Sequence, residues 1–189
     1  MNAQIDKVAK PRGRPSARDA ILDAAEAVVV TDGAPALTLD SAARRAGLSK
    51  GGVLYHFPTK ESLLQGMIER LIERTETVHK AIMEAQPDEP RRSLRAYVMN
   101  SVSDPASIDL VSGSLLAAVA NDASLLDPVR AFFRRRLPQI TRRLSFERAG
   151  VIHLATEGLW LMEVLKISPF TPGQRKKLVA ELVRLAGEA

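Results

Sequence analysis

Residues 38–60, TLDSAARRAGLSKGGVLYHFPTK, contain two short helical segments separated by a glycine corner. We expect the first helix over Leu39–Ala46, since apolar residues recur there at helical spacing and Thr38 can cap its start. Gly47 should end it, because glycine tolerates the left-handed conformation found at many helix ends. Ser49 can cap the second segment in the same way. A helix, a short glycine turn and a second helix form the helix-turn-helix pattern, whose second helix enters the DNA major groove.

The second segment, Lys50 to His56, has an unusual first turn for a helix that only packs against its neighbours. Gly51 and Gly52 each cost roughly 1 kcal/mol relative to alanine, and the missing side chains let the backbone approach another surface closely. Lys50 places a positive charge where it opposes the helix dipole. We interpret this turn as a surface that meets DNA phosphates or a guanine edge. The alternative is an ordinary helical hairpin with a solvated lysine.

Residues 46–64, AGLSKGGVLYHFPTKESLL, resemble the DNA-binding signature of the TetR/AcrR family of bacterial transcriptional regulators. The resemblance extends over about residues 17–64. It implies a three-helix DNA-binding head, a larger helical body that binds a ligand and forms a dimer, and no catalysis. By resemblance, the Tyr55 hydroxyl, the His56 imidazole and Lys60 reach phosphates.

The sequence departs from the family pattern at two positions within this signature. Ala42 stands where a larger aliphatic residue is usual, and Gly52 stands where a small residue with a hydroxyl or methyl group is common. One base-facing position therefore has no side chain. The DNA-contacting residues that we predict are Arg12, Arg14, Thr38, Ser49, Lys50, Gly51, Gly52, Tyr55, His56 and Lys60.

The residues before the first helix form a basic arm, residues 1–15, which we expect to be flexible because Pro11, Gly13 and Pro15 oppose regular structure. Arg12 and Arg14 lie in the sequence RGRP. Arginines on a flexible arm can enter a narrow, A·T-rich minor groove. The alternative is a tail that only aids solubility.

The composition excludes several classes of protein. The 189 residues carry a net charge of +5 and contain no cysteine, so there is neither a disulfide framework nor a thiolate site. The histidines are scattered, and neither a nucleophile elbow nor a phosphate-binding glycine loop is present. We therefore expect no catalytic residues, no metal site and no cofactor. With no signal peptide and no apolar run of about 20 residues, we expect no membrane segment and a cytoplasmic location.

The remaining pattern predicts an all-α chain of about nine helices, with no strand alternation and no repeat. We divide it into the arm (1–15), a helix-turn-helix DNA-binding domain (16–62) and a helical ligand-binding and dimerisation domain (63–189). Asp104-Pro105 and Asp127-Pro128 each read as a cap followed by a first-turn proline. Thr59 can cap the helix from Lys60 to about Glu84 but lacks a glutamate or glutamine for a full capping box. The expected helices are 17–32, 39–46, 50–56, 60–84, 91–103, 105–121, 129–144 with a kink at Pro138, 146–167 and 172–186.

The helix 146–167 is apolar over more than one stripe, including Val151, Leu154, Trp160 and Leu165, so it should be buried on more than one side. We predict that the last two helices of two subunits form a four-helix homodimer interface, with close approach at Gly158. A wholly internal core helix is the alternative.

The predicted effector is a small apolar or aromatic molecule bound between the helix 60–84 and the body, because methionines adapt to varied shapes. The lining residues that we predict are Met67, Leu71, Met99, Leu116 and Trp160, each of which could instead be ordinary core.

Six arginines are concentrated on one expected body helix, 129–144: Arg130, Arg134, Arg135, Arg136, Arg142 and Arg143. We interpret them as a solvated face, with an anionic ligand or an acidic partner as the alternative. Arg175, at the start of the last helix, opposes the helix dipole and is interpreted as solubilising.

These observations lead to a ligand-responsive, homodimeric repressor that binds a palindromic double-stranded operator. A DNA-binding regulator without a ligand is the second hypothesis, and a helical interaction module or enzyme without DNA binding is the third.

Overall fold

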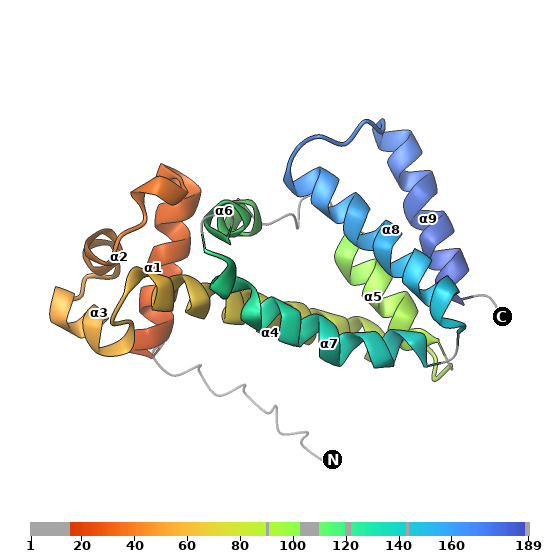
Figure 1. Ribbon diagram of the computed structural model, residues 1–189, viewed down its shortest axis with the longest axis horizontal. Helices are drawn as coiled ribbons and strands as arrows, with labels where there is room; N and C mark the ends of the chain where they lie inside the picture. Colours follow the sequence, from red (N-terminus) through yellow and green to blue (C-terminus); the bar gives the residue numbers. More distant parts are fainter. Residues whose placement is uncertain (1–15, 90, 103–109, 120–121, 143, 188–189) are drawn as a thin grey trace, which may run out of the picture.

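The computed structural model describes residues 16–89, 91–102, 110–119, 122–142 and 144–187, and the regular structure in these residues is entirely helical (Figure 1). The prediction of an all-α chain with about nine helices is confirmed. The α-helices of the described residues are α1 (Ala17–Asp32), α2 (Leu39–Ala46), α3 (Lys50–His56), α4 (Lys60–Glu84), α5 (Arg92–Val102), α6 (Leu110–Val119), α7 (Asp127–Thr141), α8 (Phe146–Val164) and α9 (Pro172–Gly187). Short 3-10 turns, η1 (Ala34–Ala36) and η3 (Ala123–Leu126), precede α2 and α7. No helix in this described part is long and apolar enough to cross a membrane.

Side-chain caps begin most of the helices where the sequence predicts them. The expected caps Thr38, Ser49 and Thr59 each accept a hydrogen bond from a backbone N–H in the following turn, and so do Ser16, Ser145 and Thr171. The prediction that Thr59 lacks a full capping box was wrong. The Thr59 N–H donates to the Ser62 hydroxyl at 3.1 Å, so a serine closes the box in place of a glutamate.

The start of α7 also differs from the prediction. Asp127 is the first helical residue rather than the cap, and its carboxylate accepts from Arg130 at 2.7 Å. The preceding turn η3 is capped instead by Asp122, whose side chain accepts from the Ser124 N–H. Pro138 lies inside α7 as expected, and its kink stays a prediction. Asp104-Pro105, Asn121 and Arg143 lie outside the described residues.

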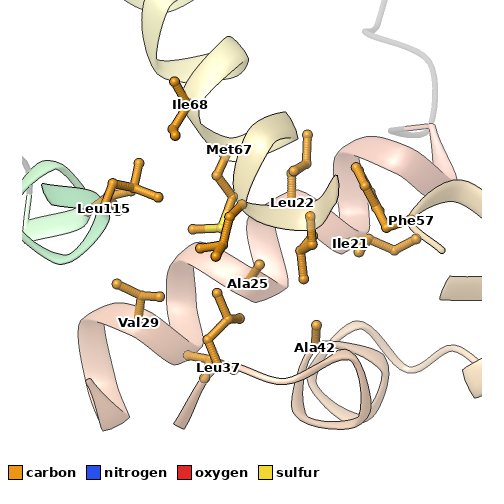
Figure 2. Packing of buried hydrophobic residues seen from close by; sticks show 14 of the residues in the cluster. Ile21, Leu22, Ala25, Val29, Leu37, Ala42, Phe57, Met67, Ile68 and Leu115 are labelled. Carbon is orange, nitrogen blue, oxygen red and sulfur yellow. The ribbon is translucent and has the colours of Figure 1, made fainter. Parts of the chain in front are cut away.

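The first of two hydrophobic cores joins α1, α2 and α3 to the start of α4. Leu22 and Ala25 of α1, Met67 of α4 and Leu115 of α6 belong to this core and are labelled in Figure 2. Val53 of α3 is fully buried in this core. The N-terminal half of α4 is therefore part of the same packed unit as the three helices before it.

The second core lies further along the chain, between α5, α7, α8 and α9. Its largest fully buried side chain is Tyr97 of α5. Arg175 of α9 forms an ion pair with Glu163 of α8, and its side chain is largely buried, so the interpretation of Arg175 as solubilising was wrong. Helix α4 runs from the first core to this one and packs there against α5 and α7 (Figure 1).

Candidate nucleic-acid interface and interior polar site

The corner between α2 and α3 is set by Gly47. Its φ of +67° is left-handed, and the Leu48 N–H donates to the Ala43 carbonyl at 3.0 Å across the end of α2. Leu48 packs against the first core, and Val53 anchors α3 from within it. These contacts hold α3 by one face and leave the opposite face in solvent.

The exposed face of α3 carries the predicted contact residues. Tyr55 is 84% exposed, and Lys50 and Gly51 are also exposed, whereas His56 is half-buried with its ring 5.1 Å from that of Tyr55. Phe57, just beyond, is buried in the core.

The two glycines of α3 are not explained by internal packing. A Cβ built on Gly51 would lie 4.0 Å from its nearest neighbour, the Ser49 hydroxyl, and one on Gly52 would lie 3.4 Å from the same atom. Both distances are ordinary contacts, and neither glycine has a positive φ. Nothing in the described part of the chain requires glycine at these positions.

Lys50 lies beside Asp40 of α2, with Nζ 3.1 Å from the carboxylate. Both side chains are 60% exposed, so the pair contributes little to stability and a DNA phosphate could compete for the lysine. Thr38 is exposed at the start of α2, and Ser49 is exposed with its hydroxyl holding the Gly52 N–H at 3.1 Å. Lys60 is half-buried at the start of α4. Arg12 and Arg14 lie outside the described residues.

Ion pairs orient α1 on α4. Arg70 Nε donates to Glu26 at 2.9 Å and Arg70 Nη1 to Asp23 at 2.7 Å, while Arg74 pairs with the other Glu26 oxygen at 3.0 Å. The Arg70 and Glu26 side chains are largely buried. Since a well-paired buried charge is costly to separate, these contacts fix the first half of α4 against α1.

The predicted effector-lining residues do not lie together. Met67 is fully buried in the first core, and Leu71 packs against that core. Trp160 packs against the second core. Met99 and Leu116 are half-buried, and the Met99 sulfur lies 3.8 Å from the Gln86 amide nitrogen. Their role in ligand binding stays a prediction.

A polar cluster that the sequence did not predict lies in the second core. The Tyr97 hydroxyl of α5 donates to Glu157 of α8 and lies 2.5 Å from Nδ1 of His153, also on α8. Burial raises the pKa of Tyr97, and the adjacent Glu157 raises it further. Burial also raises the pKa of Glu157, although the hydrogen bond from Tyr97 opposes that change.

Arg136 of α7 belongs to the same cluster. It is only 5% exposed, and its guanidinium lies over the rings of Phe132, at 5.1 Å, and Tyr97, at 5.7 Å. The expectation of a solvated arginine face is therefore wrong for this residue, although Arg130, Arg134, Arg135 and Arg142 are exposed. The sequence carried a signal for the burial of Arg136, because it is four residues from both Phe132 and Ile140, which places all three on one helix face.

His79 of α4 is a fifth polar residue near this cluster. It is 5% exposed, and its pKa is lowered to about 4 by burial and by the positive charge of Arg136. The imidazole is therefore neutral at pH 7. Its Nδ1 is buried and has no hydrogen-bond partner among the described residues.

Comparison with known proteins agrees with this geometry. Residues 21–67 match the family model "Bacterial regulatory proteins, tetR family", and residues 91–187, more than half of the chain, match the model "Tetracyclin repressor-like, C-terminal domain". The chain belongs to the TetR family. The resemblance that residues 46–64 predicted is confirmed. TetR-family proteins are DNA-binding transcriptional regulators and not enzymes, which also confirms the prediction that this chain is not an enzyme.

Two curated TetR-family relatives show how far the similarity extends. The regulator EthR of Mycolicibacterium smegmatis is 34% identical over 92 residues, which are 45% of this chain and 42% of EthR. The regulator BetI of Serratia proteamaculans is 27% identical over 185 residues, 90% of this chain and 92% of BetI. The match to EthR thus spans less than half of that protein, whereas the match to BetI spans nearly all of it.

Solved structures share the fold. A TetR-family transcriptional regulator from Rhodococcus sp. superposes with a TM-score of 0.70 at 21% identity, over 91% of this chain and 97% of that one. The multidrug binding protein EbrR, complexed with imidazole, gives a TM-score of 0.66 at 21% identity, over 93% and 98% of the two chains.

Proposed function

We propose that this TetR-family regulator is a cytoplasmic repressor that binds a palindromic operator as a homodimer and leaves it when a small molecule binds the body. The observation that carries the proposal is the exposed first turn of α3, with two glycines that no contact within the described chain requires. We assign DNA binding to residues 16–62, a supporting role to the arm (1–15), and ligand binding and dimerisation to residues 63–189.

In the proposed complex, α3 enters the major groove with its first turn against the base edges. Gly51 and Gly52 allow the backbone to approach, Lys50 exchanges Asp40 for a phosphate or guanine, and Tyr55 reaches the backbone of the DNA. Thr38, Ser49, His56 and Lys60 are the flanking contacts. Two-fold symmetry would place two α3 helices about 34–36 Å apart, one turn of duplex, or near a multiple of that distance.

The proposed dimer rests on the outer face of α8. Val151, Leu154, Leu161 and Leu165 recur at helical spacing, and Leu154 is 71% exposed. Gly158 lies within this stripe, and a Cβ there would meet nothing within 4 Å. An exposed apolar stripe of this length favours a protein interface over solvent, and closing it against a second α8 would bury it.

The proposed switch needs a ligand that binds more tightly to the conformation in which the two DNA-binding domains do not match the operator spacing. A ligand with equal affinity for both conformations would not change their populations. The packing supports a connection between the body and the DNA-binding domain, because α4 belongs to the first core at one end and contacts α5 and α7 at the other. A DNA-binding regulator without a ligand remains the second candidate. Operator affinity that stays constant across a broad panel of compounds would favour it.

The test begins with genomic fragments captured by the purified protein and sequenced to find the operator. Fluorescence anisotropy then measures the affinity of the wild type and of the double variant Lys50→Ala, Tyr55→Ala. We expect at least a tenfold loss, because two charge-assisted or polar contacts are removed. Lys176→Ala, which removes an exposed charge from α9, is the control and should bind as the wild type does. Equal affinity of the double variant and the wild type would overturn the assignment of α3.

A further inference from the structure

Arg136 is a buried cation whose hydrogen-bonding capacity is only partly used. Its Nε and Nη2 atoms are buried and have no acceptor among the described residues. Burial lowers the pKa of its guanidinium, which shows how unfavourable the site is for a charge. A buried, unpaired donor on a charged group is costly, and an acceptor brought by a ligand would remove this cost.

The neighbouring carboxylates are engaged elsewhere. Glu157 accepts from the Tyr97 hydroxyl, and Glu76 pairs with Arg135, whose Nη2 lies 3.3 Å away. No ion pair of the described residues includes Arg136. The faces of Phe132 and Tyr97 attract the guanidinium as cation–π partners, but ring faces do not accept from its in-plane N–H donors as an oxygen would.

The surroundings of Arg136 combine polar groups and apolar walls from four helices. His79 comes from α4, Tyr97 from α5, and His153 and Glu157 from α8, with the Phe133 ring 5.5 Å from that of His153. Like Nε and Nη2 of Arg136, the Nδ1 atom of His79 is buried and has no hydrogen-bond partner among the described residues. A few convergent polar groups among aromatic and aliphatic side chains are typical of small-molecule sites.

We propose that Arg136 anchors the effector of this regulator, and that the effector is a carboxylate with an apolar or aromatic portion. The two in-plane donors of the guanidinium bind the two carboxylate oxygens, the geometry for which arginine is suited. The Phe132, Phe133 and Tyr97 rings contact the apolar portion. The proposal rests on the ligand response of the proposed function and names the chemical class of the ligand. It retains the predicted apolar or aromatic character but moves the site from Met67 and Leu71 to the interior polar cluster.

The test compares acids with their neutral amides on the full-length protein. The probes are hexanoate, octanoate, phenylacetate and 3-phenylpropionate, each against its primary amide, measured by isothermal titration calorimetry and thermal shift. We expect at least one carboxylate to bind the wild type roughly 10- to 100-fold more tightly than its amide, since the amide cannot form the charge-assisted hydrogen bonds of the acid.

Two variants of α7 assign the effect to one side chain. Arg136→Met keeps the length of the side chain without its charge and should abolish the preference for the acid, whereas Arg134→Met, an exposed position on the same helix, should keep it. Arg136→Met should also unfold at a higher temperature than the wild type without ligand, because an unpaired buried charge is removed. Arg136→Lys should bind the acid more weakly than the wild type.

The outcomes separate this inference from the proposed function. If no acid binds better than its amide, or if Arg136→Met retains the preference, Arg136 is a structural residue and the inference is wrong. Operator binding by the same samples would still support the proposed DNA-binding function. If acids bind through Arg136 but operator affinity does not respond, the site stands and the ligand-controlled switch is refuted. A lower unfolding temperature of Arg136→Met would also count against the inference.

Discussion

Gly66 lies where α4 passes over the first core. A Cβ at this position would lie 2.7 Å from a ring carbon of Phe57 and 3.4 Å from a methyl group of Leu22. Both neighbours are buried, so the added methyl group cannot be accommodated without repacking the core of the head. The glycine that matters for packing is therefore Gly66, whereas Gly51 and Gly52 have room for a side chain.

We expect Gly66→Ala to destabilise the protein by about 1–2 kcal/mol, because overpacking outweighs the gain in helix propensity. Gly173→Ala is the matched control, since a Cβ there meets nothing within 4 Å. The control should be neutral or stabilise by up to about 1 kcal/mol. Urea unfolding measures both, and an unchanged midpoint for Gly66→Ala would contradict the packing.

His79 makes stability depend on pH. Burial and Arg136 lower its pKa to about 4, so between about pH 6.5 and 4 the unfolded chain binds a proton that the folded protein does not. This contribution is constant above pH 6.5 and falls with acidification, by on the order of 2–3 kcal/mol near pH 4.

We therefore expect His79→Gln to lose less stability than the wild type between pH 6.5 and 4.5, and to show the same pH dependence above pH 7. Denaturant unfolding at a series of pH values gives the difference between the two proteins. His56→Gln, at a half-buried position on α3, controls for the removal of a histidine. Parallel curves for His79→Gln and the wild type would show that the folded state protonates His79 without penalty.

At the scale of elements, α3 and α8 each leave one face exposed to solvent. The face of α3 is short and polar, with Lys50 and Tyr55, whereas that of α8 is long and apolar, with Val151 and Leu154. A charged polymer suits the first, and a second apolar helix suits the other. The chemistry of each face thus distinguishes two kinds of partner.

We expect Leu154→Glu to convert the proposed dimer into a monomer of 20.6 kDa, because a carboxylate in the centre of an apolar interface is left without a partner. Light scattering coupled to gel filtration gives the mass. Val78→Glu is the control, since Val78 is an exposed apolar residue on α4, outside the α8 stripe. A wild type that already elutes as a monomer would remove the basis for the dimer.

At the scale of the whole molecule, α4 is the continuous element between the two cores. Met67 and Arg70 hold its first half to α1, and His79 lies near Arg136 in its second half. Since one rigid helix carries both sets of contacts, we expect a displacement at the interior polar cluster to change the orientation of the α1–α3 unit. The contacts between α1 and α4 include a largely buried ion pair as well as apolar packing.

The arm acts at this scale too, because it would extend DNA binding beyond the α1–α3 unit. Deleting residues 1–15 removes four positive charges and one negative charge. We expect weaker operator binding and a salt dependence whose slope is smaller by about 0.9 for each phosphate that the arm neutralises in the intact protein. Anisotropy titrations at several salt concentrations measure the slope. An unchanged slope would show that the arm neutralises no phosphates and serves only as a solubilising tail.

The helices, most of their caps and the corner at Gly47 could be predicted from the residues alone, because they depend on interactions within a few positions of the chain. The packing of the helices was needed to show that Arg136 and His79 share one buried region, that Arg175 pairs with Glu163, and that Met67 and Trp160 belong to different cores. The reason is physical: the burial of a charge depends on which helices pack around it, and residues 57 positions apart in the chain carry no local signal of their proximity.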